Sequence, residues 1–111
     1  MAPLPHAARA VIDIRKIEDY CLSPTHPRGR HKARVFREAL GLKQIDAQWL
    51  RQALLDGLRQ EDAFELARDD LGVRFRVDVG LARHGKRVVV RTIWMVRSGE
   101  ELPRFVTCWV L

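Results

Sequence analysis

The chain has 111 residues, of which 47% are hydrophobic and 31% charged, with 20 lysines and arginines against 14 acidic residues. This length fits one domain, residues 1–111, which buries about two-thirds of its unfolded surface without disulfides or metals. No apolar run approaches the roughly 18 residues of a membrane span and no secretory signal is evident, so we expect a cytoplasmic protein without membrane partners.

Residues 13–70 are expected to be mainly helical, after a loose segment over residues 1–10. Asp13 can cap a short helix through its side chain, because the apolar residues that follow recur at helical spacing. Two prolines in the stretch 23–27 must end that helix, since proline cannot continue one. A second helix is then expected over residues 30–40.

Gly41 supplies the C-terminal stop of this second helix. A third helix is expected to begin at Asp46 and to run to about Gln60. Ile45 before that cap and Leu50 after it have the spacing of a hydrophobic staple, so we expect these two side chains to pack together.

The segment 61–70 is ambiguous between two structures. Phe64 and Leu66 fit the alternation of a strand. Ala63, Leu66 and Ala67, with the acidic residues around them, fit a helix instead, and we favour the helix. The choice decides whether the sheet that follows has three strands or four.

From Leu71 onward the apolar period changes to two, which is typical of half-buried strands. Residues 83–86 predict a hairpin turn and residues 98–101 a second turn, so residues 71–111 form a β-meander. Helices followed by such a meander predict an α+β domain. In this fold class, the N-terminal helices pack on one face of a three- to four-stranded antiparallel sheet.

The faces of the sheet follow from an assumed register in which Leu81 lies opposite Val88 and Arg97 opposite Arg104. One face is then mainly apolar and packs on the helices: Phe75, Val77, Val79, Val90, Thr92, Trp94, Phe105, Thr107 and Trp109. The other face is half-apolar and carries five arginines: Arg74, Arg76, Arg91, Arg97 and Arg104, with Ile93, Met95, Val106 and Cys108. A slip of one residue would exchange the faces.

The positive charge is unevenly distributed. Residues 1–42 hold eight basic and four acidic residues, residues 43–72 four and seven, and residues 73–111 eight and three. Arginine outnumbers lysine 16 to 4, and arginine binds phosphate bidentately and stacks on bases. RNA or another polyanion is therefore the first partner to consider, although a solvated arginine-rich surface explains the total equally well.

The densest basic segment, residues 27–37, has five lysines and arginines, one histidine and no acid. It spans a glycine and the start of the second helix, where free N–H groups favour an anion. The alternative is a solvated basic helix face. The pattern predicts a phosphate or nucleic-acid site that two sheet arginines join: Arg28, Gly29, Arg30, Lys32, Arg34, Arg91 and Arg104.

His31 beside Lys32 suits phosphodiester cleavage. A histidine can take the proton of a ribose 2′-OH, and a fixed lysine can hold the charge that develops on the phosphate. His26 is a candidate for the second acid or base, and Thr92 or Thr107 for a hydroxyl donor to a phosphate oxygen. The structural alternatives are surface histidines and strand threonines that only pack.

Two cysteines, Cys21 and Cys108, lie far apart and show no CxxC spacing. No structural zinc site of ordinary ligand spacing can be built from them, so neither a metal nor a cofactor is predicted. We expect both to be reduced thiols, with one disulfide between them as the alternative.

Residues along nearly the whole chain match one recurrent pattern: Tyr20, Leu22, His26, Pro27, Gly29, Lys32, Ala33 and Phe36, then Thr92, Trp94, Pro103, Arg104, Val106 and Thr107. Through them the chain resembles a small bacterial domain family of unassigned function. Its members read roughly K-x-x-x-Y-x-L-N-x-x-H-P-x-G-x-x-K-A-x-x-F, with a later T-x-W and P-R-x-V-T. The chain departs from that pattern at Ser23, where Asn is usual.

Members of that family occur alone and as C-terminal modules of polymorphic-toxin-like and phage head-associated proteins. That setting is similar to the barnase/EndoU/colicin/RelE-type ribonuclease toxins, which use His, Lys, Arg and Thr or Ser around a sheet cleft without a metal. The resemblance implies a toxin-type, metal-independent endoribonuclease acting through a 2′,3′-cyclic phosphate. The alternative is a non-catalytic nucleic-acid- or partner-binding module of a toxin–immunity or phage-related system. Besides RNA, a small acidic immunity- or antitoxin-like protein is a candidate partner. Both hypotheses are compatible with a monomer and with a dimer.

Overall fold

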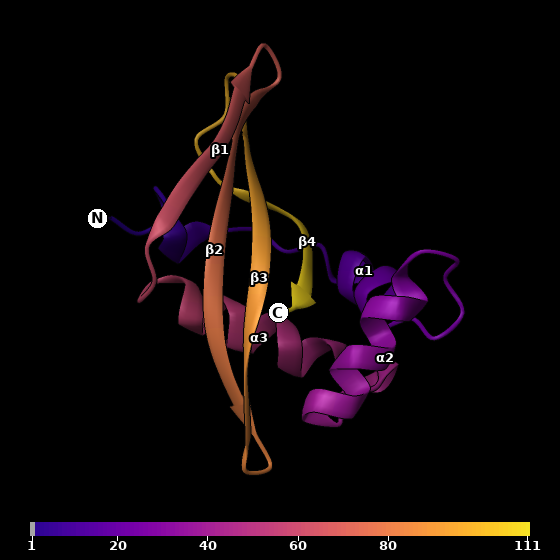
Figure 1. The fold of residues 1–111 in the computed structure, drawn as a ribbon. Coiled ribbons are helices and arrows are strands. Elements are labelled where there is room, and N and C mark those ends of the chain that lie inside the picture. The colour runs from indigo at the N-terminus through magenta and orange to yellow at the C-terminus, as the bar shows by residue number, and fades with distance from the viewer. Residues whose placement is uncertain (1) are drawn as a thin grey trace.

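The helices come first along the chain and the strands last (Figure 1). The computed structural model describes residues 2–111. The helices are α1 (Ile14–Lys16), α2 (Gly29–Leu40) and α3 (Ala47–Leu58), with a π-helical turn η2 (Ile17–Cys21) and 3-10 turns η1 (Ala7–Arg9) and η3 (Gln44–Asp46). No helix among residues 2–111 is long and apolar enough to cross a membrane.

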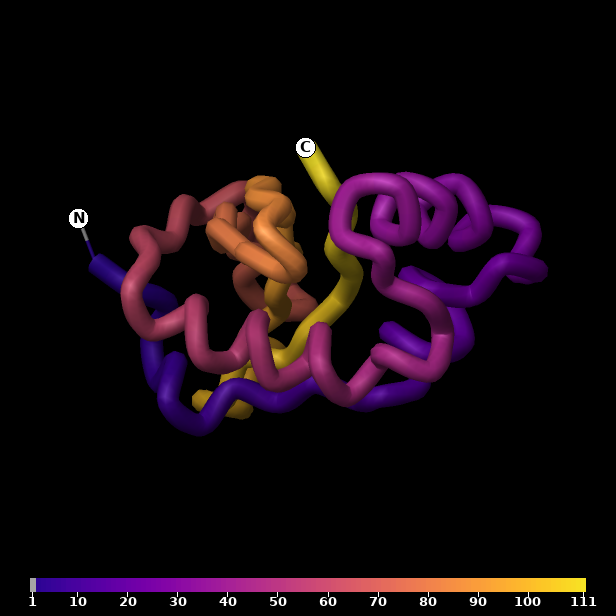
Figure 2. The backbone as a smooth tube through the Cα atoms, turned by 90° about the horizontal axis from the view of Figure 1, so that it is seen from below, coloured from indigo at the N-terminus to yellow at the C-terminus, as the bar shows by residue number. Residues whose placement is uncertain are grey.

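The strands form one antiparallel sheet in the order β1-β2-β3-β4. Their bounds are β1 (Ala63–Asp69), β2 (Gly72–Arg83), β3 (Lys86–Arg97) and β4 (Arg104–Val110). The predicted α+β class is therefore confirmed. Figure 2 shows α3 and the N-terminal segment along one face of the sheet, while α2 stands beside β4.

Two predicted helix boundaries are confirmed by their capping contacts. The Asp13 side chain accepts a hydrogen bond from the Arg15 backbone N–H at 3.0 Å and so caps α1. Gly41 ends α2 in the left-handed conformation, with a φ of 66° that glycine adopts without strain. The prolines and turn residues between η2 and α2 separate the two helices as expected.

The predicted hydrophobic staple before α3 is wrong. Leu50 is fully buried, but Ile45 is 89% exposed. The Lys43 backbone N–H donates to the Asp46 carboxylate at 2.8 Å, which closes the 3-10 turn η3. A staple needs an extended residue before the helix. The tight turn instead directs Ile45 into solvent.

The helix favoured for segment 61–70 is also wrong, because Ala63–Asp69 forms the edge strand β1. This strand pairs with β2 along its length, with a bulge between Glu65 and Ala67. Its side chains are mostly exposed, so the strand lacks the strong alternation of a half-buried one. The unpaired edge of β2 decides the structure here, and local sequence does not encode that edge.

The β2–β3 hairpin has the predicted register, with Leu81 opposite Val88. Its turn residues His84 and Gly85 both have positive φ, 52° and 77°. Two such residues form the turn type that matches the twist of the flanking strands. The short loop therefore determines the pairing of these two strands.

The register assumed for β3 and β4 is wrong. Arg104 lies opposite Met95 and not opposite Arg97, and the pairing shifts again between Ile93 and Trp94. That irregularity inserts Val106 as an extra residue in β4. As a result Cys108 faces the core, opposite Thr92, and the residues on either side of it turn to the other face.

The core lies between α3, η2 and the inner face of the sheet. Its largest fully buried side chains come from every layer: Trp94, Phe36, Phe105, Leu4, Ile17, Leu40, Leu42, Leu50, Leu54, Leu58, Val77 and Val79. Trp94 and Phe105 meet edge to face with ring centroids 5.5 Å apart. The N-terminal segment also pairs with the sheet through Val11, which bridges to Arg104 at the start of β4.

Thr92, a predicted hydroxyl donor to phosphate, is instead fully buried in this core. Its Oγ1 donates to the Val77 carbonyl at 2.6 Å and accepts from the Trp94 Nε1–H at 2.7 Å. Both hydrogen-bonding functions of the hydroxyl are thus used inside the protein. Thr92 therefore satisfies a buried indole and is not available to a ligand.

We predict that Thr92→Val lowers the free energy of unfolding by about 1–3 kcal/mol, because the substitution leaves the buried Trp94 N–H unpaired. Urea denaturation measures the loss. In a Trp94→Phe background the same substitution should cost less, since no indole N–H remains to be orphaned. An equal cost in both backgrounds would contradict this role of Thr92.

Candidate functional site

Lys32 is the centre of the candidate site, and its partners are uncharged in their ordinary states. Its Nζ donates to Thr107 Oγ1 at 3.0 Å and to Tyr20 OH at 3.3 Å. The same nitrogen lies 4.8 Å from the Tyr20 ring centroid and 5.2 Å from that of Trp109. Within residues 2–111, no carboxylate forms an ion pair with Lys32. The half-buried ammonium is therefore free to bind an anion.

Three elements bring these groups together. Lys32 comes from the first turns of α2, Tyr20 from the π-helical turn η2, and Thr107 from β4. Close packing of α2 on η2 depends on Gly29, because a Cβ at this position would overlap the Tyr20 carbonyl oxygen. Gly29 is buried, so its observed role is this close approach.

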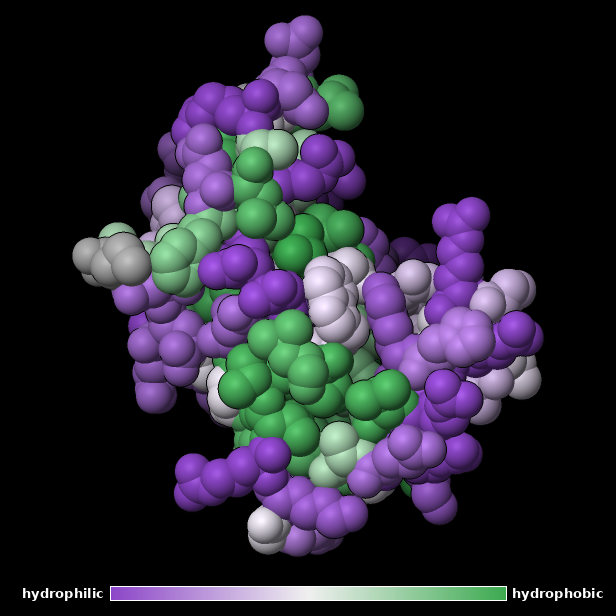
Figure 3. Space-filling model, in the orientation of Figure 1, coloured by the Kyte–Doolittle hydropathy of each residue, from purple (hydrophilic) through white to green (hydrophobic). Residues whose placement is uncertain are grey.

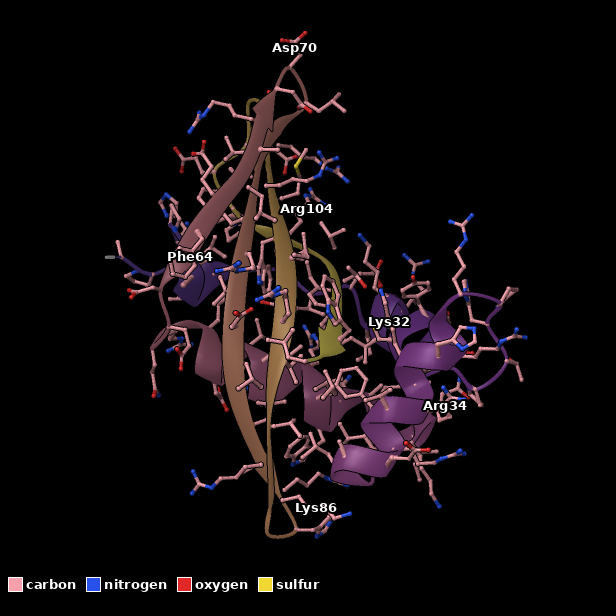
Figure 4. The ribbon with its side chains drawn as sticks, viewed as in Figure 1. Lys32, Arg34, Phe64, Asp70, Lys86 and Arg104 are labelled. Carbon is pink, nitrogen blue, oxygen red and sulfur yellow. The ribbon has the colours of Figure 1, made fainter. Side chains whose placement is uncertain are left out.

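The extra residue in β4 supplies the sheet side of the site. Thr107 pairs with Ile93 and Trp109 with Arg91, both on the face of the sheet opposite α3. The Lys32 side chain extends from α2 toward β4 at this edge of the sheet (Figure 4). Without the added residue, both side chains would point into the core.

His26 supports the site through a hydrogen-bonded turn. Its Nδ1 accepts from the backbone N–H groups of Arg28 and Gly29, each at 3.0 Å, and so caps the start of α2. Its ring meets the Tyr20 ring edge to face with centroids 4.7 Å apart. Because Nδ1 accepts two hydrogen bonds, the proton of the neutral ring is on Nε2. His26 therefore positions α2 and Tyr20.

Ser23 begins the same turn. Its Oγ accepts from the backbone N–H groups of Thr25 at 3.4 Å and His26 at 3.2 Å. An Asn at this position would make the same kind of turn through its side-chain oxygen. The departure at Ser23 thus keeps the physical role of the position.

An open pocket of about 460 Å³ adjoins Lys32 and is lined also by His31, Val35, Trp109 and Val110. The His31 side chain is exposed, and its ring makes no hydrogen bond with any residue from 2 to 111. Both of its ring nitrogens are therefore open to a ligand. The pocket combines one cation, one free imidazole and an indole ring, which suits a nucleotide with its phosphate on Lys32.

The other predicted phosphate ligands lie away from this pocket. Arg104 Nε donates a hydrogen bond to the Glu100 carboxylate at 2.9 Å, and the residue lies toward the other end of the sheet (Figure 4). Arg91 donates twice to Asp78, at 2.9 and 3.1 Å. Arg30 and Arg34 line a separate pocket on α2, and Arg28 is exposed in the turn before α2. Of the predicted catalytic residues, Lys32 and Thr107 are in direct contact, through the hydrogen bond from Nζ to Oγ1.

The sheet face opposite α3 carries a row of arginines, so this part of the predicted surface is confirmed. Arg74, Arg76 and Arg91 lie on it, while Cys108 has moved to the core and Thr107 and Trp109 have taken its place. Arg76 stacks over the Phe64 ring at 4.8 Å. Figure 3 shows this face, where hydrophilic side chains surround an apolar area over the lower part of the sheet.

Cys21 and Cys108 are free, fully buried thiols behind the site. Cys21 Sγ lies 3.8 Å from Thr107 Oγ1. A hydrogen bond from Cys108 lowers the pKa of Cys21 to about 7, and the positive charge of Lys32 contributes in the same direction. Burial raises the pKa of Cys108.

Two site residues were missed by the sequence analysis. The spacing around Tyr20 gives it no role, although the recurrent pattern of the sequence includes it together with Lys32 and Thr107. Trp109 was placed in the core by the assumed register. No group of three or more His, Cys, Asp or Glu side chains within residues 2–111 is placed to hold a metal ion.

A comparison with protein-family models finds one match, described as "Domain of unknown function (DUF6883)", over residues 3–111. No curated protein and no solved structure matches the chain. The match covers all the elements of the site described above.

We predict a pH-dependent stability effect for Asp78 on the arginine face. The hydrogen bond from Arg91 holds the pKa of Asp78 below its usual value. The pair therefore stabilises the fold above the unfolded pKa of about 3.9, and this contribution is lost as the pH falls through the lower folded value. At pH 7, Asp78→Asn should cost about 0.5–1 kcal/mol.

Urea denaturation of both proteins from pH 7 downward checks this effect. The difference between wild type and Asp78→Asn should shrink toward zero in acid. Asp70→Asn, at an exposed turn, is the control and should leave stability unchanged at every pH. A difference for Asp78→Asn that is the same at acid and neutral pH would contradict the ion pair.

Proposed function

The chain belongs to the family described as Domain of unknown function (DUF6883), and we propose that it acts as a toxin-type, metal-independent endoribonuclease. One observation carries the proposal: a half-buried lysine bound by two hydroxyls, without a carboxylate partner among residues 2–111, at the edge of an arginine-bearing sheet face. A phosphate is the anion that such a lysine and such a face would bind together.

Lys32 and Thr107 are proposed to hold the scissile phosphate. An ammonium has three donors, and Lys32 uses two of them on Thr107 and Tyr20, which leaves one for a phosphate oxygen. Thr107 accepts from Lys32 through Oγ1, so its own proton can be donated to a second phosphate oxygen. These donors stabilise the negative charge that grows on phosphorus during transesterification.

The strand is proposed to run from this pocket over the open face of the sheet. Trp109 lines the pocket and offers a ring on which a base can stack, while Arg74 and Arg76 lie farther across the face. Such a surface binds single-stranded RNA mainly through its backbone and the faces of its bases. The 2′-OH that the reaction needs restricts cleavage to RNA.

The proposed reaction is attack of the 2′-oxygen on phosphorus, which breaks the bond from phosphorus to the 5′-oxygen. His31 accepts the proton of the 2′-OH, because its ring nitrogens are free. Tyr20 donates its phenol proton to the leaving 5′-oxygen, and the adjacent Lys32 ammonium stabilises the resulting phenolate. The products are a 2′,3′-cyclic phosphate and a 5′-hydroxyl end. His26 is assigned a positioning role, because its Nδ1 caps the start of α2.

The second candidate function is a nucleic-acid-binding module without catalysis. It is favoured by one observation: within residues 2–111, no histidine hydrogen-bonds to Lys32 or Thr107. In that case the same lysine and arginines would hold RNA by its phosphates alone. Binding would then weaken with salt according to the number of phosphates neutralised.

We predict that the purified protein cleaves total RNA in the presence of EDTA and leaves 2′,3′-cyclic phosphate ends. Lys32→Ala should lower the cleavage rate about 100-fold, because the charge on the phosphorane loses its main donor. RNA affinity, measured by fluorescence anisotropy, should fall only a few-fold. Lys86→Ala, at the exposed β2–β3 turn, is the matched control and should keep full activity.

The binding module gives a different outcome of the same experiment. RNA that stays intact at micromolar protein, together with salt-sensitive binding that Lys32→Ala weakens, would overturn the enzyme proposal in favour of that module. Cleavage that Lys32→Ala leaves unchanged would overturn the assignment of this site.

We also predict separate effects for the three aromatic polar residues. His31→Ala and Tyr20→Phe should each slow cleavage about 100-fold, since each removes a proton carrier. His26→Asn should keep most of the activity, because an Asn oxygen can accept the same backbone N–H groups. His26→Ala should lower the thermal midpoint instead. Greater loss of cleavage in folded His26→Asn than in His31→Ala would reverse these roles.

A further inference from the structure

A second basic surface lies on the side of α2 away from Lys32. It is a groove of about 620 Å³ between α2 and the η3 turn, which we call the basic groove. Its charged and apolar walls are formed chiefly by six residues: Arg30, Arg34, Arg37, Lys43, Leu42 and Ile45. In Figure 4, Lys32 lies on the side of α2 toward β4 and Arg34 on the side away from the sheet.

The positive charge of the basic groove is not neutralised within the protein. Its four cations, Arg30, Arg34, Arg37 and Lys43, are all exposed, and none forms an ion pair with a carboxylate of residues 2–111. Elsewhere the arginines are commonly paired, as Arg91 is with Asp78. Four like charges on one wall repel one another, and a bound polyanion removes that repulsion.

Ile45 adds an apolar contact at the rim of this groove. The η3 turn leaves its side chain 89% exposed, although Leu42, which also lines the groove, is buried in the core. A single exposed aliphatic residue is ordinary on a protein surface. Here it stands next to Lys43 and faces a groove whose other wall is cationic, so an occupant can make both kinds of contact at once.

The walls favour a protein occupant over a nucleic acid. His31 is the one aromatic residue that lines the basic groove, whereas proteins that bind single-stranded nucleic acid stack successive bases on several aromatic rings. Aliphatic side chains next to guanidinium groups instead complement a peptide with aliphatic anchors and carboxylates. We propose that the basic groove docks an acidic protein segment, whose carboxylates bind Arg30 and Arg34 while an aliphatic side chain packs on Ile45.

The docking site does not depend on the proposed function of Lys32. One consequence does rest on that function: His31 lines both the basic groove and the pocket beside Lys32. A docked segment would therefore lie against the residue that we propose as the base. The binding experiment below is read without any cleavage assay, so its outcome is separate from that of the ribonuclease proposal.

The test compares three fluorescein-labelled probes by anisotropy at low salt. They are a glutamate-rich peptide containing leucines, the same peptide with serine in place of each leucine, and an oligouridylate of equal net charge. The leucine peptide should bind most tightly. Combined Arg30→Glu and Arg34→Glu substitutions should weaken its binding at least about tenfold, and Ile45→Ser should weaken it about fivefold.

The control is a variant with Arg9→Glu and Arg59→Glu, which changes the net charge equally at exposed positions outside the groove. It should keep the affinity for the leucine peptide. Both substituted side chains are exposed, and an acidic residue at position 30, in the first turn of α2, suits the helix dipole. The groove variant should therefore fold, and circular dichroism checks this.

Three results would overturn the proposal. Equal loss of binding in the control and groove variants would show that net charge alone attracts the peptide. Equal affinity for the leucine and serine peptides would remove the role of Ile45. Tightest binding of oligouridylate, lost on substitution of Arg30 and Arg34, would make the groove a nucleic-acid surface instead.

Discussion

The extra residue in β4 is the constraint on which the candidate site depends. Side chains alternate along a strand, so a single insertion exchanges every residue beyond it between the two faces. Here the insertion of Val106 turns Cys108 into the core and directs Thr107 and Trp109 to the opposite face. Lys32 then finds a hydroxyl and an indole ring at the sheet edge, and its ammonium stays without a carboxylate from residues 2–111.

The turn before α2 is the second condition. The side chains of His26 and Ser23 accept hydrogen bonds from backbone N–H groups of this turn. Gly29 allows the helix to approach η2 closely. This arrangement sets the rotation of α2, which places Lys32 toward the sheet and Arg34 away from it (Figure 4). The helix therefore presents two separate cationic surfaces, and the proposed chemistry and the proposed docking belong to different sides of one element.

Residue patterns predicted much of the fold and part of the site. Capping by Asp13, the stop at Gly41 and the pairing of Leu81 with Val88 depend on contacts between neighbours in sequence, so they could be read directly. The chemistry of Lys32 and Thr107 also predicts a place in the site. The same chemistry predicts one for Thr92 and Arg104, but the core uses the Thr92 hydroxyl and Glu100 binds Arg104. Chemistry alone does not distinguish a free group from one already satisfied.

By itself, the sequence determined the α+β class, the order of helices and strands, the tight first hairpin and the clustering of basic residues in two regions, because each follows from spacing or local turn geometry. Only the tertiary structure decided three features: the strand over 63–69, the register of β4 and the exposure of Ile45. The first depends on a free strand edge and the second on a loop of unconstrained length. The third depends on the η3 turn, which the Asp46 carboxylate closes and which Gln44 and Arg83 join to distant parts of the chain. Whether a cation meets a hydroxyl, a carboxylate or solvent is likewise settled by partners far apart in the chain, as Lys32 and Thr107 are.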